Sequence, residues 1–332
     1  MSPSGALTKD AHGQTLLGVA MYLVAAFLFA FNGTGAKLIM AAGLPPERLT
    51  ELRNAGALVV LLIVVGIIRP QRFRVARDEW RFLIAYGVIA FTVVQFLYFL
   101  TISRLPLGVG TLLAFLAPVI VALWNRWVRK VSVSPTIWLA LVLTLVGLAL
   151  ITQIWQGLTL DLVGVLAGLG TACGLALYWM LGEAGQRQRD ALSLTMWGFV
   201  FSTLAWSILQ PWWGYPFDVL AQTADPLLPN TPGLPVWVLM TWGIVMGTVV
   251  PFLLVLGALR RLGAQRAGIV GTSEPIWAAL IAAFTLGEAI SGIQAVGGLV
   301  VITGIILAET ARVTSAAGSP PIHAAAESSR RN

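Results

Sequence analysis

The chain carries the stretch Gly271-Thr272-Ser273-Glu274-Pro275-Ile276-Trp277 in the middle of an apolar run that extends from about 267 to 286. An acidic side chain at the centre of a membrane-spanning helix costs about 2.5–3.5 kcal/mol, so such residues usually face a bundle interior or a watery cavity. Pro275 lacks an N–H and its ring crowds the carbonyl of Gly271, which predicts a bend and a free carbonyl. Freed backbone inside a membrane is tolerated where protein or a polar cavity surrounds it. We therefore predict that this helix lines a substrate path.

The overall composition is that of an integral membrane protein. The 332 residues are 58% hydrophobic and 11% charged, against roughly 25% charged in a typical soluble domain, and the mean hydropathy is +0.85. The net charge of +7 comes from Lys and Arg residues in short loops between apolar runs, as orientation in a membrane requires. No basic stripe with interleaved aromatics is present, so nucleic acid is not an expected partner.

Cysteine and histidine usage narrows the possible chemistry. The single cysteine, Cys173, excludes an intrachain disulfide and a multi-cysteine metal site. His12 and His323 both lie in the polar tails, so no histidine-based metal site or proton relay is expected within the membrane. Neither paired acids nor a nucleophile with a base can be recognised. We expect no metal, no cofactor and no enzymatic activity.

Apolar runs of about 20 residues, the length that crosses a bilayer, occur ten times. They lie at roughly 16–40, 47–68, 80–102, 106–127, 136–154, 162–182, 194–210, 236–259, 266–286 and 290–311. The pattern predicts an all-α membrane protein with ten transmembrane helices. Residues 1–15 and 312–332 are expected to be cytoplasmic tails, and the composition of the second tail predicts disorder.

Lys and Arg are distributed unequally between the two sets of loops. If the N-terminus is cytoplasmic, the outside loops hold only Arg48 and Arg104, and the long 211–235 loop holds no basic residue. The inside loops collect Arg69, Arg72, Arg74, Arg77, Arg81, Arg126, Arg129, Lys130, Arg187, Arg189, Arg260, Arg261 and Arg266. This asymmetry predicts that both termini are cytoplasmic, and we expect a multi-pass protein of a bacterial inner membrane.

Two segments far apart in the chain resemble each other. The twelve residues 93–104 match 249–260 at six positions, and after one residue of slippage Ala117-Pro118 lies over Glu274-Pro275. Chance similarity between two Leu/Val-rich stretches is the alternative. A true repeat gives two halves, 16–155 and 160–311, of five spans each, and the odd number makes their topology inverted. Inverted repeats are an architecture of secondary transporters, with the substrate near the midplane.

Several motifs resemble one known family. They are Thr272-Ser273-Glu274-Pro275-Ile276-Trp277-Ala278-Ala279-Leu280, Leu286-Gly287-Glu288, the stretch Gly297 to Gly304 and, more loosely, Leu116-Ala117-Pro118-Val119. Together they resemble the EamA-type carriers of the drug/metabolite transporter superfamily. The first half departs from the pattern after Trp124, where Asn125-Arg126-Trp127 replaces the expected Leu-Gly-Glu. The resemblance implies a ten-helix carrier of two inverted halves with a central pocket between helices one, three, four, six, eight and nine. It also implies amino-acid export, because the members most similar in length and aromatic content export amino acids, including aromatic ones.

Polar and aromatic residues away from the predicted helix ends are the candidates for substrate binding. They are Asn32, Gln95, Tyr98, Tyr178, Trp179, Trp242, Ser273, Glu274 and Trp277, and for each one alone ordinary core packing is the alternative. Pro118 and Pro275 are candidates for helix breaking and gating. Glu274 has three possible roles: coupling to protons, pairing with a substrate ammonium, or hydrogen bonding that only holds the bundle together. Arg53 could attract a carboxylate, or it could snorkel to the interface or pair with Glu47 or Glu51; we expect the second reading.

We therefore predict a secondary transporter that moves small amphipathic metabolites by alternating access. The preferred substrates are neutral amino acids with hydrophobic or aromatic side chains, moving outward. The alternatives are a drug or cation exporter of the same superfamily and a membrane-embedded protein that does not transport. Expected partners are the small-molecule substrate and the lipid bilayer. The sequence leaves open proton coupling versus facilitated diffusion, and a monomer versus a dimer.

Overall fold

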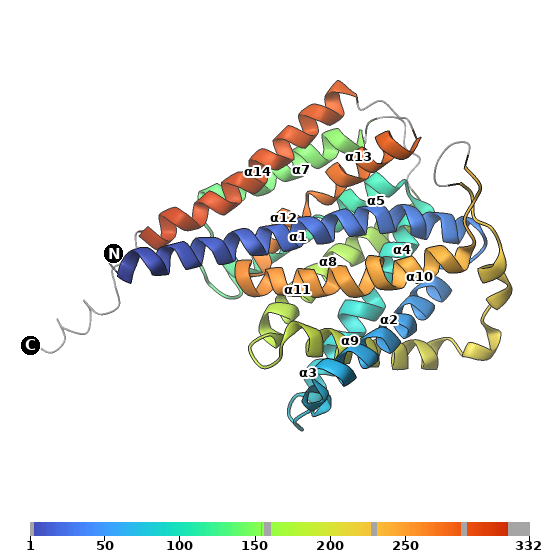
Figure 1. Cartoon of the computed structure of the whole chain (residues 1–332). Coiled ribbons are helices and arrows are strands. Elements are labelled where there is room, and N and C mark those ends of the chain that lie inside the picture. Colours follow the sequence, from blue (N-terminus) through green and yellow to red (C-terminus); the bar gives the residue numbers. More distant parts are fainter. Residues whose placement is uncertain (1–2, 154, 156–160, 227–230, 287–290, 318–332) are drawn as a thin grey trace, which may run out of the picture.

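The protein is a bundle of long helices (Figure 1), and the computed structural model describes residues 3–153, 155, 161–226, 231–286 and 291–317. The helices are α1 (Pro3–Ala41), α2 (Pro46–Ile68), α3 (Trp80–Tyr86), α4 (Val94–Arg104), α5 (Leu107–Ala114), α6 (Ala117–Trp127), α7 (Pro135–Thr152), α8 (Leu162–Gly185), α9 (Ala191–Leu209), α10 (Val236–Ile244), α11 (Val250–Leu262), α12 (Ala264–Gly271), α13 (Glu274–Leu286) and α14 (Gly292–Ala317). Two π-helical segments, η2 (Gly87–Val93) and η5 (Val245–Val249), join α3 to α4 and α10 to α11. Three short 3-10 turns are η1 (Pro70–Phe73), η3 (Trp212–Gly214) and η4 (Phe217–Ala221).

These elements combine into ten transmembrane helices. Within the described residues, eight helices are long and apolar enough to cross a membrane, from Gly13–Ala41 to Val236–Leu262. The other two spans are the α12–α13 pair and α14, whose apolar part is Gly292–Ala308. The predicted all-α architecture of ten helices in two inverted halves is confirmed.

The start of the second tail differs from the sequence prediction, which gave residues 312–332 as disordered. Helix α1 already begins at Pro3 and α14 continues to Ala317. Of the predicted tails 1–15 and 312–332, residues 3–15 and 312–317 are therefore helical. A helix that has already formed extends at little cost, because each further residue adds a hydrogen bond without a new nucleation step. The rest of the second tail, and most of the predicted junction at 155–160, lie outside the described residues.

The sequence repeat is visible in the backbone. The π-helical segment η2 ends at Val93 and η5 ends at Val249, the two valines that the repeat places over each other. A π-helical turn is rare and inserts one extra residue per turn. Its occurrence at equivalent places in helices three and eight shows that the local geometry repeats with the sequence.

Helices four and nine are each broken at equivalent places. Helix α5 ends at Ala114 and α6 begins at Ala117, while α12 ends at Gly271 and α13 begins at Glu274. The single bent helix predicted over 266–286 is therefore wrong. A proline in the first turn of a helix has no hydrogen bond to lose, so starting a new helix one residue before Pro275 is cheaper than bending a continuous one.

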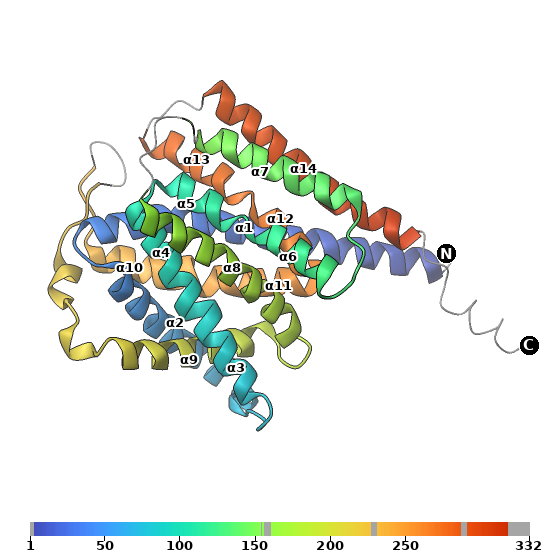
Figure 2. The ribbon, with the colours of Figure 1, turned by 180° about the vertical axis from the view of Figure 1, so that it is seen from behind.

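Helices α7 and α14 form a closely packed pair along one edge of the bundle (Figures 1 and 2). A Cβ atom on Gly147 would lie 2.7 Å from the carbonyl oxygen of Gly297, and a Cβ on Gly297 would lie 2.8 Å from the carbonyl of Gly147. Small residues allow such close approach of helix backbones in membranes. These glycines therefore set the distance between helices five and ten.

Polar contacts fasten the two ends of the bundle. The start of α1 and the end of α14 lie at one end of the molecule, and the segment with η3 and η4 lies at the other (Figures 1 and 2). At the second end, Arg48 pairs with Glu51 at 2.7 Å and donates to the carbonyls of Pro211 and Gly214.

Between α3 and α9, Arg189 binds the carboxylate of Glu79 at 2.6 Å. The hydrogen bonds that Arg189 donates lower the pKa of the Glu79 carboxyl. This ion pair joins the loop before α3 to the start of α9.

Candidate functional site

A cavity lies at the centre of the bundle, where helices of both halves meet. The space between its lining residues, open solvent included, is about 810 Å³. Six of the nine predicted binding residues line it: Asn32, Gln95, Tyr98, Tyr178, Trp179 and Glu274. They come from α1, α4, α8 and α13, so segments from across the chain converge on one space.

The other three predicted binding residues lie outside this lining. Trp242 packs against Phe31 with ring centroids 4.7 Å apart, and Trp277 meets the edge of Phe27 at 5.5 Å. The hydroxyl of Ser273 is buried between α12 and α13 and has no hydrogen-bond partner in the described part of the chain.

The two predicted gating prolines occupy equivalent positions beside the cavity. Pro118 and Pro275 each follow the first residue of a helix, α6 and α13. Both lie directly after the broken backbone of helices four and nine. Phe115, in the first of these breaks, lines the cavity.

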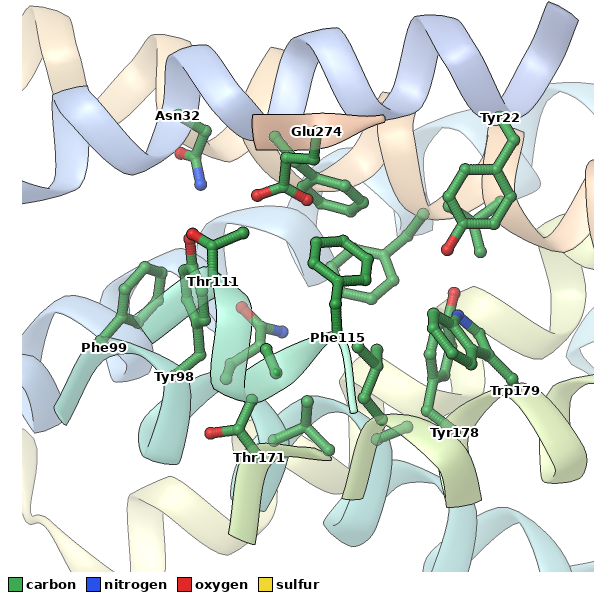
Figure 3. A pocket seen from close by; sticks show the side chains of 18 of the residues that line it. Tyr22, Asn32, Tyr98, Phe99, Thr111, Phe115, Thr171, Tyr178, Trp179 and Glu274 are labelled. Atoms are coloured by element: carbon green, nitrogen blue, oxygen red, sulfur yellow. The ribbon is translucent and has the colours of Figure 1, made fainter. Parts of the chain in front are cut away.

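Glu274 is the first residue of α13, and its carboxylate points into the cavity (Figure 3). The N-terminal end of a helix carries a partial positive charge, which stabilises a carboxylate placed there. Among the described residues, no hydrogen bond or ion pair to this side chain is found. The helix terminus explains how the carboxylate is tolerated and leaves its oxygens available to a ligand.

Arg53 is the second charged residue of the cavity lining, and the sequence prediction for it was wrong. The side chain does not snorkel to an interface or pair with Glu47 or Glu51; it is 2% exposed and lines the cavity. Its guanidinium donates to Asn32 Oδ1 at 2.5 Å, to the carbonyl of Gly247 at 2.8 Å and to the hydroxyl of Thr248.

The surroundings of Arg53 stabilise a buried cation without supplying a countercharge. The guanidinium carbon lies 5.0 Å from the centre of the Phe99 ring, a distance at which a cation is attracted by the ring face. No carboxylate within 4.0 Å of it is found in the described part of the chain, and its Nε has no hydrogen-bond partner. Burying an unpaired charge is costly, so this guanidinium is poised to accept an anion.

The cavity has a polar end and an aromatic end. Figure 3 shows Asn32, Thr111, Tyr98 and Glu274 gathered on one side, while Tyr22, Tyr178 and Trp179 meet on the other. Phe252 closes the aromatic end and packs against Tyr178, with ring centroids 5.5 Å apart.

Glycines of α12 make room for this aromatic end. Cβ atoms on Gly268 and Gly271 would lie 2.7 Å from the Trp179 ring and 2.8 Å from the Tyr22 ring. Sequence reasoning missed Tyr22, Phe115, Thr111 and Phe252. Residues of these types are common in any membrane helix, and the one available signal for Tyr22 was a hydroxyl within a predicted span.

A comparison with protein families identifies the chain. The model of the EamA-like transporter family matches it twice, over residues 16–153 and 162–310. The chain belongs to the EamA-like transporter family. This EamA-like protein is thus a membrane transporter, and each of its two matches covers five of the ten helices.

Curated proteins similar to this EamA-like protein include bacterial transporters. The threonine/homoserine exporter RhtA of Salmonella typhimurium strain SL1344 is 28% identical over 234 residues, which cover 70% of this chain and 72% of RhtA. The uncharacterized inner membrane transporter YicL of S. typhimurium strain LT2 is 24% identical over 300 residues, or 89% of this chain and 96% of YicL.

A solved crystal structure shares the fold of this EamA-like protein. The two superpose with a TM-score of 0.67 over 90% of this chain and 98% of the other, at 19% identity. The common architecture is therefore that of the whole transporter and not of one half alone.

Proposed function

We propose that this transporter carries neutral α-amino acids with apolar or aromatic side chains, and that it exports them by alternating access. The observation that carries the proposal is the pairing of one guanidinium and one carboxylate in a single cavity. Arg53 and Glu274 are the two charged side chains among the described residues that line it. Their charges cancel, as do those of a zwitterionic ligand.

The two charged side chains suit the two charged groups of an amino acid. A guanidinium presents a planar fork of donors that matches a carboxylate. The oxygens of Glu274, at the start of α13, accept hydrogen bonds from an ammonium. A ligand that neutralises both groups at once removes two unpaired charges from the interior, and this favours binding over an empty cavity.

The aromatic end of the cavity favours a large apolar side chain. Tyr22, Phe115, Tyr178, Trp179 and Phe252 supply the walls there. Aromatic rings gain from edge-to-face and offset contacts in addition to the burial of their surface. The name of RhtA gives threonine and homoserine as the cargo of that protein, which supports amino acids as the class, while the aromatic walls here favour a bulkier member of it.

A cation exporter is the second candidate, and one observation favours it. The Glu274 carboxylate and the aromatic rings form surroundings that attract a lipophilic cation. Arg53 opposes this reading, because the same cavity holds its buried positive charge. The presence of both charges therefore favours the zwitterion.

Counterflow in proteoliposomes tests the proposal. Vesicles with purified protein are loaded with an unlabelled aromatic, aliphatic or charged amino acid or a cationic dye, and uptake of radiolabelled phenylalanine or of the dye is followed. We expect rapid phenylalanine uptake against aromatic and large aliphatic amino acids and slow uptake against charged ones. Dye exchange without phenylalanine exchange would replace the proposal with the cation reading.

The direction and orientation belong to the same proposal. We place both termini and the basic loops in the cytoplasm of a bacterial cell, on the distribution of Lys and Arg. The two halves, 16–155 and 160–311, then rock about the cavity between them. A thiol-reactive, membrane-impermeant label on a cysteine added after Asn332 should react in inverted vesicles and not in intact spheroplasts; the opposite result would reverse the orientation.

A further inference from the structure

Helix α2 carries two adjacent buried polar residues, Arg53 and Asn54, at the level of the cavity. Arg53 is 2% exposed and Asn54 is 0% exposed. Two such residues in a membrane helix need hydrogen-bond partners, because the bilayer offers none. Their partners lie in the two π-helical segments, one in each half of the protein.

Each residue binds one π-helical segment. Arg53 donates to the carbonyl of Gly247 at 2.8 Å and to the hydroxyl of Thr248, both in η5. Asn54 donates to the carbonyl of Phe91 in η2 at 2.8 Å.

The amide of Asn54 also reaches a second residue of η2 through α9. Asn54 Nδ2 donates to the hydroxyl of Ser202 at 2.7 Å, which lies 2.8 Å from the hydroxyl of Thr92. In each segment, a backbone carbonyl and the threonine that follows it are therefore bound.

The residues bound in the two segments are equivalent by the internal repeat. The repeat aligns Val93 with Val249, which places Phe91 over Gly247 and Thr92 over Thr248. Arg53 and Asn54 therefore hold the same two backbone positions in opposite halves. A π-helical turn has a wider ring of hydrogen bonds than an α-helix and often lies at a functional site, so these segments are natural points for helices three and eight to flex.

The geometry of the guanidinium links this contact to the ligand. A carboxylate that binds an arginine side-on uses Nε and the Nη2 on the same edge. In Arg53 the Nε has no partner, while Nη2 donates to Gly247 and Thr248. A side-on carboxylate in the cavity must therefore take at least one hydrogen bond away from η5.

We propose that Arg53 and Asn54 form a clamp between the two halves, and that the carboxylate of the transported molecule opens the clamp on the η5 side. Asn54 keeps its hold on η2, so the two halves become free to move relative to each other only when the ligand occupies Arg53. Arg53 is then both the carboxylate-binding residue and the residue that makes movement depend on the ligand. This inference rests on the proposed function, because it requires a carboxylate in the cargo.

The consequence appears in the rates of two transport modes. Exchange needs only the loaded carrier to reorient, whereas net efflux also needs the empty carrier to return with the clamp closed. Unmodified protein should therefore exchange phenylalanine much faster than it releases phenylalanine into empty buffer. Thr248→Val removes one hydrogen-bond partner of Arg53. It should raise the ratio of the net efflux rate to the exchange rate by about tenfold, which corresponds to the free energy of one hydrogen bond to a charged group.

A matched variant controls for the loss of a buried hydroxyl. Thr195 is also 0% exposed, and among the described residues its hydroxyl binds only the carbonyl of Ala191, in its own helix. Thr195→Val should leave the ratio unchanged, and Thr248→Ser, which keeps the hydroxyl, should restore it. An unchanged ratio in Thr248→Val would overturn the clamp. Failure of the unmodified protein to exchange any amino acid would instead overturn the proposed function.

Hydrogen exchange tests the clamp without a variant, and applies equally if Thr248→Val does not fold. Phenylalanine added to the unmodified protein should speed amide exchange in η5 and leave η2 unchanged, since only the Arg53 side opens. Slower exchange in η5, or equal changes in both segments, would contradict the proposal.

Discussion

Gly247→Ala tests the geometry that holds Arg53 in the cavity. A Cβ on Gly247 would lie 2.3 Å from Oδ1 and 2.7 Å from Cγ of Asn32, about 1 Å closer than a normal contact. Asn32 is 5% exposed and bound to Arg53, so it can retreat only by releasing the guanidinium. The loss of a hydrogen bond to a charged group costs about 1.5–3 kcal/mol, and the change from glycine to alanine in a helix returns about 1 kcal/mol. We expect a net destabilisation of about 0.5–2 kcal/mol.

Gly243→Ala is the matched control, one turn earlier on the same helix. Its Cβ would meet Asn32 Oδ1 at 3.6 Å and Arg53 Nη1 at 3.7 Å, which are ordinary contacts. The assay is thermal unfolding of the purified protein in detergent, followed by tryptophan fluorescence, together with phenylalanine exchange. Gly247→Ala should unfold at a lower temperature than Gly243→Ala and exchange more slowly. A Gly247→Ala protein as stable and as active as the control would refute the reasoning.

Three further predictions concern the cavity carboxylate, an ion pair and a helix contact. Glu274→Gln should keep the fold and lower the apparent affinity for phenylalanine by tenfold or more, because truncating one member of a buried charge pair costs about 2–5 kcal/mol. Unchanged counterflow would contradict a role of Glu274 in binding the substrate. The lowered pKa of Glu79 beside Arg189 means that their bond contributes stability above the ordinary glutamate pKa of about 4.3, and that this contribution is lost as the pH falls below that value. The Tm of Glu79→Gln should therefore be lower than that of the unmodified protein at pH 7 and should approach it toward pH 3, and a constant difference would count against the pair. Gly297→Ala places a Cβ 2.8 Å from a backbone carbonyl of α7 and should destabilise the folded protein by about 1–3 kcal/mol. In the control Gly298→Ala, the added Cβ meets no atom within 4 Å, and the stability should not change. Equal Tm values for the two variants would show that α7 and α14 can move apart without cost.

The sequence predicted the spans because the bilayer imposes a length and a composition on each of them. The repeat was also visible in the sequence. Its alignment agrees with the structure, where the two aligned valines, Val93 and Val249, end the two π-helical segments. The interruption of helix nine was placed correctly, between Gly271 and Pro275, but its nature was predicted wrongly. Pro275 was interpreted as a bend within one helix, but the same missing N–H is satisfied better in the first turn of a new helix, which begins at Glu274.

Arg53 shows why part of the site was beyond the sequence. An arginine near the start of a span can snorkel or be buried, and the choice depends on partners from elsewhere in the chain. Here those partners are Asn32 on α1 and Thr248 in η5, which are far from Arg53 in sequence. Trp242 and Trp277 illustrate the converse, because their type suited a pocket while their helix faces turned them toward Phe31 and Phe27.

In the proposed transport cycle, one cavity recognises both charges of an amino acid, through Arg53 and Glu274. Competition for phenylalanine exchange by two analogues tests this most directly: phenethylamine lacks the carboxylate and 3-phenylpropionate lacks the ammonium. Each analogue leaves one buried charge unpaired, so each should inhibit at least about 30-fold more weakly than phenylalanine itself. Inhibition by either analogue at the same concentration as phenylalanine would contradict the claim.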